Sequence, residues 1–148
     1  MTQHRLPSLT VRHTYSHPAE RVFDAWVDPA VTRRWLFATT DGEIVRCDID
    51  ARIGGGFVIT DRRAGDDVEH HGRYLEIDRP RRLAFTFSVP KYSSEASRVT
   101  IDVVPVAEGC ELTLLNHDVP PEWVSETERG WRELLARLDN LLGVRADT

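Results

Sequence analysis

One stretch of sequence decides the fold: PEWVSETERGWRELLARLDNLL, residues 121–142. Its large apolar residues recur at spacings of three and four, which places them on one side of a helix with 3.6 residues per turn. They are Trp131, Leu134, Leu135, Leu138, Leu141 and Leu142. A helix of about 20 residues is about 30 Å long, enough to cross a small domain. We therefore expect the rest of the chain to wrap around this apolar stripe.

The other faces of this helix carry charges and one glycine. Two acid–base pairs are spaced four residues apart, Glu128 with Arg132 and Glu133 with Arg137. This order of charges favours ion pairs on a helix surface. Gly130 lies mid-helix, where glycine costs about 1 kcal/mol relative to alanine. Either the sheet or a ligand approaches closely at Gly130, or the helix bends there.

Upstream of this helix, the sequence pattern predicts one strand, two short helices and then six strands. Strands are indicated where apolar and polar residues alternate. The alternating segments are residues 9–15, 43–48, 57–60, 68–77, 83–88, 99–103 and 112–114. Short helices are expected to start near Pro18 and Pro29, the latter capped by Asp28, because proline suits the first turn of a helix. Pro105 is expected to end the sixth strand.

The predicted fold class is α+β, with a curved antiparallel sheet of about seven strands wrapped around the long C-terminal helix. Strands joined by short turns favour antiparallel pairing. The two short helices after the first strand would plug one open end of the sheet. The sequence shows no linker, repeat or low-complexity tract, so we expect a single domain over residues 1–148 with a core of about 9–143.

Composition limits the classes of partner. The net charge of −5 argues against nucleic acid, because phosphate binding needs a basic face. No apolar segment approaches the ~20 residues that span a bilayer, and the N-terminus has no signal-peptide core, so we expect no membrane contact and a cytoplasmic location. Cys47 and Cys110 lie far apart in the sequence and are expected to be buried structural thiols. The single lysine, Lys91, gives little support for Schiff-base chemistry.

Several short motifs resemble a known family. They are VFDAW at 22–26, DP at 28–29, RW at 34–35, DARIGGGF at 50–57, GRYLEIDRPRRL at 72–83, LTL at 112–114, His117, and Gly130 with Trp131. Their order is similar to that of the family named after the activator of the heat-shock-protein-90 ATPase, within the START-like (SRPBCC, polyketide-cyclase-like) helix-grip superfamily. The resemblance implies an apolar cavity between helix and sheet, where many members of the superfamily bind lipid-like or aromatic molecules. It implies no shared catalytic residues.

Metal and catalytic motifs are not indicated. His70 and His71 are adjacent on a predicted strand and would point to opposite faces, and no HxH or HExxH spacing occurs, so we expect no metal site. The glycines at 54–56 precede a strand rather than a helix, which favours a turn over a phosphate cradle. Cys110 and His117 are seven residues apart on one strand and would also face opposite sides. We therefore predict no catalytic residues and no cofactor.

Aromatic residues are the main candidates for ligand contact. Apolar and aromatic walls with a few polar groups are typical of small-molecule pockets. The predicted ligand-binding residues are Trp35, Phe57, His71, Arg73, Phe85, Phe87, Trp123 and Trp131. For each aromatic residue, the alternative is an ordinary packed core.

His71 and Arg73 enter this set conditionally. They share a strand face with Leu75 and Ile77. If that face points inward, Arg73 would need a partner or an anionic ligand; otherwise it reaches to water. Along the long helix, we expect ligand contact around 123–131 and a structural role for 134–142.

Three functional hypotheses follow. The first is a non-enzymatic binding domain for an apolar or aromatic small molecule, held between the long helix and the concave sheet. The second is a co-chaperone-like interaction module, suggested by the family name. The third is a cyclase- or hydrolase-type enzyme that uses the same cavity. Contact with a chaperone and self-association as a homodimer both remain open.

Overall fold

The structure, a computed structural model, describes residues 8–91 and 96–143. Its strands are β1 (Leu9–Tyr15), β2 (Glu43–Ile49), β3 (Gly56–Arg63), β4 (Asp66–Asp78), β5 (Arg82–Phe87), β6 (Ser97–Val106) and β7 (Gly109–His117). Its helices are α1 (Ala19–Asp24), α2 (Pro29–Thr32), the 3₁₀ turn η1 (Pro121–Trp123) and α3 (Val124–Gly143). These elements confirm the predicted fold class.

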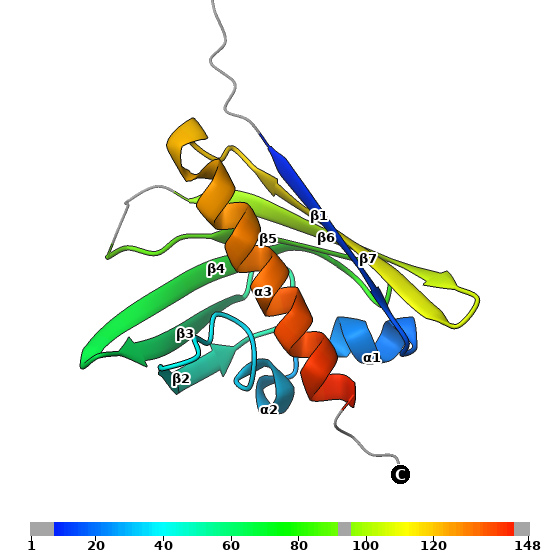
Figure 1. The fold of residues 1–148 in the computed structure, drawn as a ribbon, viewed down its shortest axis with the longest axis horizontal. Helices are drawn as coiled ribbons and strands as arrows, with labels where there is room; N and C mark the ends of the chain where they lie inside the picture. Colours follow the sequence, from blue (N-terminus) through cyan, green and yellow to red (C-terminus); the bar gives the residue numbers. More distant parts are fainter. Residues whose placement is uncertain (1–7, 92–95, 144–148) are drawn as a thin grey trace, which may run out of the picture.

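The seven strands form one antiparallel sheet in the order β1-β7-β6-β5-β4-β3-β2. Strands β1 and β2 are therefore its outer strands, and β2 contains a bulge between Ile44 and Arg46. Figure 1 shows the sheet curving around α3, which crosses its concave face diagonally. Helices α1 and α2 lie beside the C-terminal end of α3, as expected for elements that close one end of the sheet.

The local signals that start these helices act as the sequence indicates. Asp28 precedes α2, and its side chain accepts a hydrogen bond of 3.1 Å from the Ala30 backbone N–H. This bond satisfies one of the donors that the first turn of a helix leaves free. Pro18 precedes α1 in an extended conformation.

The core forms where the stripe of α3 meets the concave face. Trp131, Leu135, Leu138 and Leu142 of α3 are buried, and Leu134 and Leu141 are half-buried. On the sheet, the buried residues include Val11, Ile59, Phe85, Ile101, Leu112 and Leu114. Burial of this apolar surface is the main stabilising contribution to the fold.

Two polar contacts attach the C-terminal half of α3 (residues 135–143) to β1. The Tyr15 hydroxyl donates a 2.9 Å hydrogen bond to the Leu135 carbonyl, and both atoms are buried. One helical turn further on, His13 Nε2 lies 2.8 Å from Asp139 Oδ2. Burial raises the pKa of the Tyr15 hydroxyl far above its usual range, so this hydroxyl keeps its proton.

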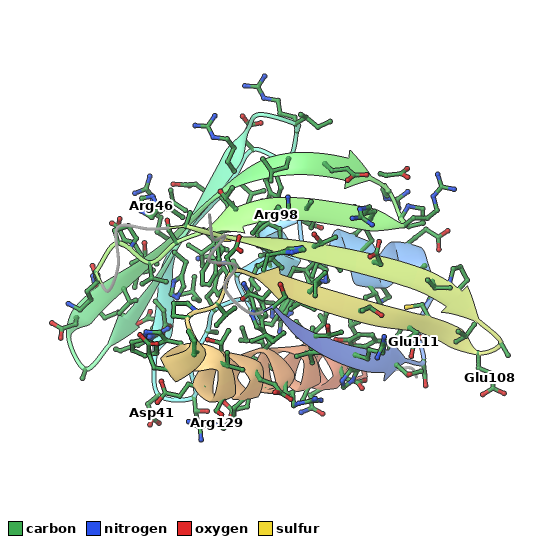
Figure 2. The ribbon with its side chains drawn as sticks, turned by 90° about the horizontal axis from the view of Figure 1, so that it is seen from above. Asp41, Arg46, Arg98, Glu108, Glu111 and Arg129 are labelled. Atoms are coloured by element: carbon green, nitrogen blue, oxygen red, sulfur yellow. The ribbon has the colours of Figure 1, made fainter. Side chains whose placement is uncertain are left out.

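Some expectations about the surface are wrong. The Glu128–Arg132 pair forms at 2.8 Å. The predicted Glu133–Arg137 pair does not, because Arg137 Nη2 reaches the Thr40 hydroxyl at 3.5 Å. Figure 2 shows Arg129 on the outer side of α3 and Glu108 at the tip of the β6–β7 hairpin, both pointing away from the molecule.

The predicted end of the sixth strand is also wrong, since β6 continues through Pro105 to Val106. Pairing between β6 and β5 already ends at Asp102. Pro105 pairs only with Cys110 of β7, so the sheet needs no donor from it on the other side. Among the described helices, none is long and apolar enough to cross a membrane.

Candidate functional site

An apolar pocket opens at the N-terminal end of α3. It has a volume of about 320 Å³ and lies between α3 with η1 and the ends of β5, β6 and β7. We call it the mouth pocket. Its walls are Phe87, Ser88, Val89, Ala96, Ser97, Asn116, Asp118, Val119, Pro120, Trp123 and Thr127.

The walls of the mouth pocket combine an exposed ring with a fixed polar group. Trp123 is 52% exposed, whereas Asn116 is 1% exposed. The Asn116 side-chain oxygen accepts a 2.9 Å hydrogen bond from Trp131 Nε1, and its amide nitrogen donates to the Ser97 hydroxyl at 3.2 Å. Asn116 therefore attaches the N-terminal half of α3 (residues 124–134) to the sheet.

A second pocket lies further along α3, beside the loop that follows α2. It has a volume of about 380 Å³ and is bounded by the loop after α2, the end of β3, one side chain of β4, and α3. We call it the loop pocket. Its walls are Phe37, Ala38, Thr39, Thr40, Arg63, His70, Gly130, Glu133, Leu134 and Arg137.

Aromatic rings fill the space between the two pockets. Phe37 contacts Phe87 with ring centroids 4.9 Å apart and Trp131 with centroids 5.9 Å apart. Phe87 and Trp131 are 6.0 Å apart in an edge-to-face arrangement. The region beneath the N-terminal half of α3 is therefore closed by side chains, with the loop pocket bordering Phe37 and the mouth pocket bordering Phe87.

A buried carboxylate anchors the loop that carries Phe37. The Asp61 side chain has no exposed surface. Its Oδ2 accepts a 2.8 Å hydrogen bond from the Thr39 hydroxyl and a 2.6 Å charge-assisted bond from Arg63 Nε. Among the described residues, the other oxygen, Oδ1, has no hydrogen-bond partner. Such a group is costly to bury, so these contacts fix the loop against β3.

Helix α3 passes this region without close contact at Gly130. No heavy atom of the described residues outside its own helical turn and neighbours lies within 4 Å of a Cβ built there. The alternative in which the sheet approaches closely at Gly130 is therefore wrong, whereas the approach of a ligand there stays a prediction. Gly130 instead lies on the wall of the loop pocket.

A larger surface pocket lies elsewhere, at the other end of α3. It has a volume of about 730 Å³ and is formed by α1, α2 and the last turn of α3. Its walls mix apolar residues with several charged side chains, including Glu20, Asp24 and Arg34. An apolar ligand is better matched by the mouth pocket, whose walls contain Phe87 and Trp123.

Five of the predicted ligand-binding residues meet in the aromatic core. Trp35, Phe57, Phe85 and Trp131 are buried, and Phe87 is half-buried. Trp35 has no exposed surface, and its Nε1 donates a 2.9 Å hydrogen bond to the Ala25 carbonyl. Of the predicted set, Phe87 and Trp123 line the mouth pocket, whereas Phe57 and His71 line a separate, shallower pocket of about 530 Å³ bounded by β2, β3 and β4. The assigned ligand roles stay predictions.

The inward orientation considered for His71 and Arg73 is wrong. Both residues lie on the convex face, where His71 contacts Glu69 at 2.8 Å and Arg73 is exposed. A bulge between Tyr74 and Glu76 shifts the alternation of β4 by one residue. Counting back from Ile77 across this bulge therefore assigns the wrong face.

Before the bulge, the concave face of β4 is formed by Val68, His70, Gly72 and Tyr74. Gly72 is required there, because a Cβ would collide with the Phe57 ring and with the Thr86 carbonyl. His70 is buried, and its Nδ1 lies 3.1 Å from the Ile59 carbonyl oxygen. Burial lowers the pKa of His70 to about 4, so its ring is neutral near pH 7.

Sequence reasoning missed Phe37, His70 and Asn116 as wall residues. Phe37 has a left-handed backbone with φ of 62°, which no apolar pattern predicts. Asn116 shares the alternation of Leu112 and Leu114, but the predicted strand ended at Leu114, two residues too early to include it. A buried amide on that face was a detectable signal of a polar anchor.

Comparisons with known proteins agree with this architecture. Protein CV1439 from Chromobacterium violaceum has a TM-score of 0.84 at 25% identity, over 95% of this chain and 98% of its own. Mll3558 from Rhizobium loti has a TM-score of 0.74 at 27% identity, over 90% and 95%. NE0264 from Nitrosomonas europaea has a TM-score of 0.79 at 21% identity, over 94% and 96%, which shows the fold alone. No curated protein matches the sequence significantly.

The family comparison identifies the same relationship from sequence. Residues 16–143 match the family described as activator of Hsp90 ATPase homologue 1-like protein. The matched range includes both pockets and all of α3. Because it extends over most of the sequence, the chain belongs to this family and has its START-like helix-grip fold.

Proposed function

We propose that the protein binds a small apolar or aromatic molecule without transforming it, between the N-terminal half of α3 and the concave sheet. The observation that carries this proposal is the mouth pocket of about 320 Å³ beside Phe87 and Trp123. Small-molecule sites typically have volumes of about 300–1,000 Å³ and mainly apolar walls. Family membership supports a ligand-binding or co-chaperone-like domain in general terms.

The polar groups of the mouth pocket fit an orienting role. The hydroxyls of Ser97 and Thr127 lie among apolar walls, where each could accept or donate one hydrogen bond. Asn116 is already bonded to Trp131 and Ser97, so it fixes the wall. A few placed polar groups in an apolar site give orientation and specificity.

The two competing hypotheses have less structural support. The enzyme hypothesis would gain support from His71 or Arg73 inside the cavity between helix and sheet, but both lie on the convex face. The co-chaperone hypothesis rests on the family description. A chaperone pull-down together with an ATPase assay tests it independently of any ligand.

A melting-temperature screen with fatty acids, flavonoids and phenols tests the proposal. A ligand at about one hundred times its Kd should raise the Tm by roughly 5–10 °C. Trp123→Ala should abolish most of this rise, because the indole borders the mouth pocket. The variant should retain the melting temperature of the free protein, since Trp123 is 52% exposed.

Val104→Ala is the matched control. Val104 is 54% exposed on β6, far along the strand from Ser97, and does not line the mouth pocket. It should leave the ligand-induced rise intact. A screen in which no compound class stabilises the wild-type protein would overturn the proposal, as would equal loss of binding in both variants.

A further inference from the structure

Three aromatic rings form a parallel group beneath the N-terminal half of α3. The Phe37 and His70 planes differ by 6° at a centroid distance of 4.4 Å, and those of Phe37 and Phe87 by 5° at 4.9 Å. His70 and Phe87 are themselves parallel within 3°, with centroids 6.1 Å apart. The three ring centroids therefore form a triangle and not a straight stack. Phe37 therefore lies flat across the two rings that the sheet presents side by side.

The Phe37 ring separates the two pockets. Phe37 and His70 line the loop pocket, whereas Phe87 lines the mouth pocket. Phe37 belongs to a loop rather than to the sheet, and its left-handed backbone is disfavoured for a residue with a side chain. Movement of this ring would expose a flat aromatic platform and join the two pockets.

The loop pocket also has a cationic side. Arg63 Nε is bonded to Asp61, while its Nη2 makes only a long contact of 3.5 Å with the Phe37 carbonyl. Arg137 is half-buried and contacts the Thr40 hydroxyl at 3.5 Å. In the part of the chain that the structure describes, no carboxylate lies within 4 Å of Arg137. Glu133 is the one carboxylate among the residues of this wall.

We propose that Phe37 is a displaceable plug and that the ligand that replaces it is a planar aromatic carboxylic acid. The ring of the acid lies on His70 and Phe87 in the place of the Phe37 ring. Its carboxylate meets the guanidinium groups of Arg63 and Arg137, which suit planar two-oxygen acceptors. This inference rests on the proposed function and names its ligand class.

The same contacts supply a reason for Phe37 to leave. A ligand shifts a conformational equilibrium only when it interacts differently with the two states. A carboxylate in the loop pocket competes with the Phe37 carbonyl for Arg63 Nη2, and a contact of 3.5 Å is weak. The incoming ring also replaces the stacking that Phe37 loses. The acid therefore favours the open position of the loop on both counts.

Calorimetric titration of the full chain with 2-naphthoic acid and its neutral analogue 2-naphthamide tests the proposal. The wild-type protein should bind the acid at least about fivefold more tightly than the amide. Phe37→Gly should tighten binding of both probes about tenfold, because it removes the competing ring and permits the left-handed backbone. Equal affinity for the two probes, or no gain in Phe37→Gly, would overturn the inference.

Glu133 and Arg137 provide a matched pair of charge variants on the same wall. Arg137→Gln should remove most of the preference for the acid and leave amide binding unchanged. Glu133→Gln should increase that preference, since it removes the opposing carboxylate. If both variants change the preference for the acid over the amide in the same direction, the carboxylate of the ligand does not face this wall.

Two further measurements keep the test independent of variant folding. If Phe37→Gly does not fold, Phe37→Leu removes the ring while retaining apolar volume, and it should also tighten binding. A crystal structure of the wild-type protein with 2-naphthoic acid should show the naphthalene over His70 and Phe87, with Phe37 turned out; Phe37 still in place refutes the plug.

If the naphthalene pair and every other screened compound fail to bind, the proposed function itself fails. Binding that is independent of Phe37 and of ligand charge refutes only this inference.

Discussion

The two halves of α3 contact the same sheet in different ways. In the C-terminal half, Leu135 and Leu138 have no exposed surface, and Tyr15 and His13 of β1 bond to the helix. In the N-terminal half, a single side-chain hydrogen bond from Trp131 reaches the sheet among the described contacts, and the mouth pocket and the loop pocket both border this half. One half of a helix can thus stabilise the fold while the other leaves space for a ligand.

Truncation of the stripe should give the largest difference between the two halves. Leu138→Ala removes a fully buried side chain and should lower the free energy of unfolding by about 4 kcal/mol. Leu134→Ala removes a half-buried side chain on the wall of the loop pocket and should cost about 1 kcal/mol. Urea denaturation measures both values. Equal losses would mean that the halves are packed alike.

The pH dependence of stability tests how well the sheet beneath the N-terminal half of α3 is shielded from water. Burial lowers the pKa of His70 from 6.5 to about 4, so between these values the unfolded chain binds more protons than the folded one. Stability should therefore fall as the pH falls through this window, by up to roughly 3 kcal/mol below pH 4.

His70→Gln isolates this contribution, because other groups titrate alike in both proteins. Denaturation of the wild type and the variant should be compared at pH 7 and pH 4.5. The wild type should lose more stability on acidification than the variant. The difference between the two losses measures the free-energy cost of protonating the buried His70 ring. Parallel profiles would show that His70 accepts a proton without cost, and hence that the ring platform is already open to water.

Gly130 gives the smallest effect and the sharpest local test. Gly130→Ala should raise the free energy of unfolding by about 1 kcal/mol, because alanine favours the helix and its methyl group meets open space. Gly143→Ala, at the last residue of α3, is the control and should change stability by only a few tenths of a kcal/mol. A loss of stability in Gly130→Ala would show that the loop pocket closes onto the helix in solution.

The architecture was predictable because long periodic patterns survive local irregularity. The stripe of α3 spans about three turns from Trp131 to Leu142, and Asp28 with Pro29 marks the start of α2 in the way that capping chemistry requires. The alternation of β7 also separated Cys110 from His117 correctly, because Cys110 is buried on the inner face and His117 lies on the other face. Such signals depend on neighbours in the sequence, so they need no tertiary information.

The walls of the pockets were less predictable because they depend on single departures from those patterns. One bulge in β4 reversed the faces of His71 and Arg73. Phe37 reaches its position through one left-handed residue. Arg137 contacts Thr40, 97 residues away in the sequence, and does not pair with Glu133 on its own helix. Each of these outcomes is decided by tertiary contacts that periodicity does not contain.

The sheet is open, and its two outer strands are protected by different means. Strand β1 is held by α3, whereas β2 carries a bulge and the exposed charged residues Glu43, Arg46 and Asp48. Bulges and charges on an outer strand oppose pairing with a strand of another molecule. The side of the fold that the helix does not hold therefore carries its own features that oppose aggregation, at the edge of the sheet away from β1.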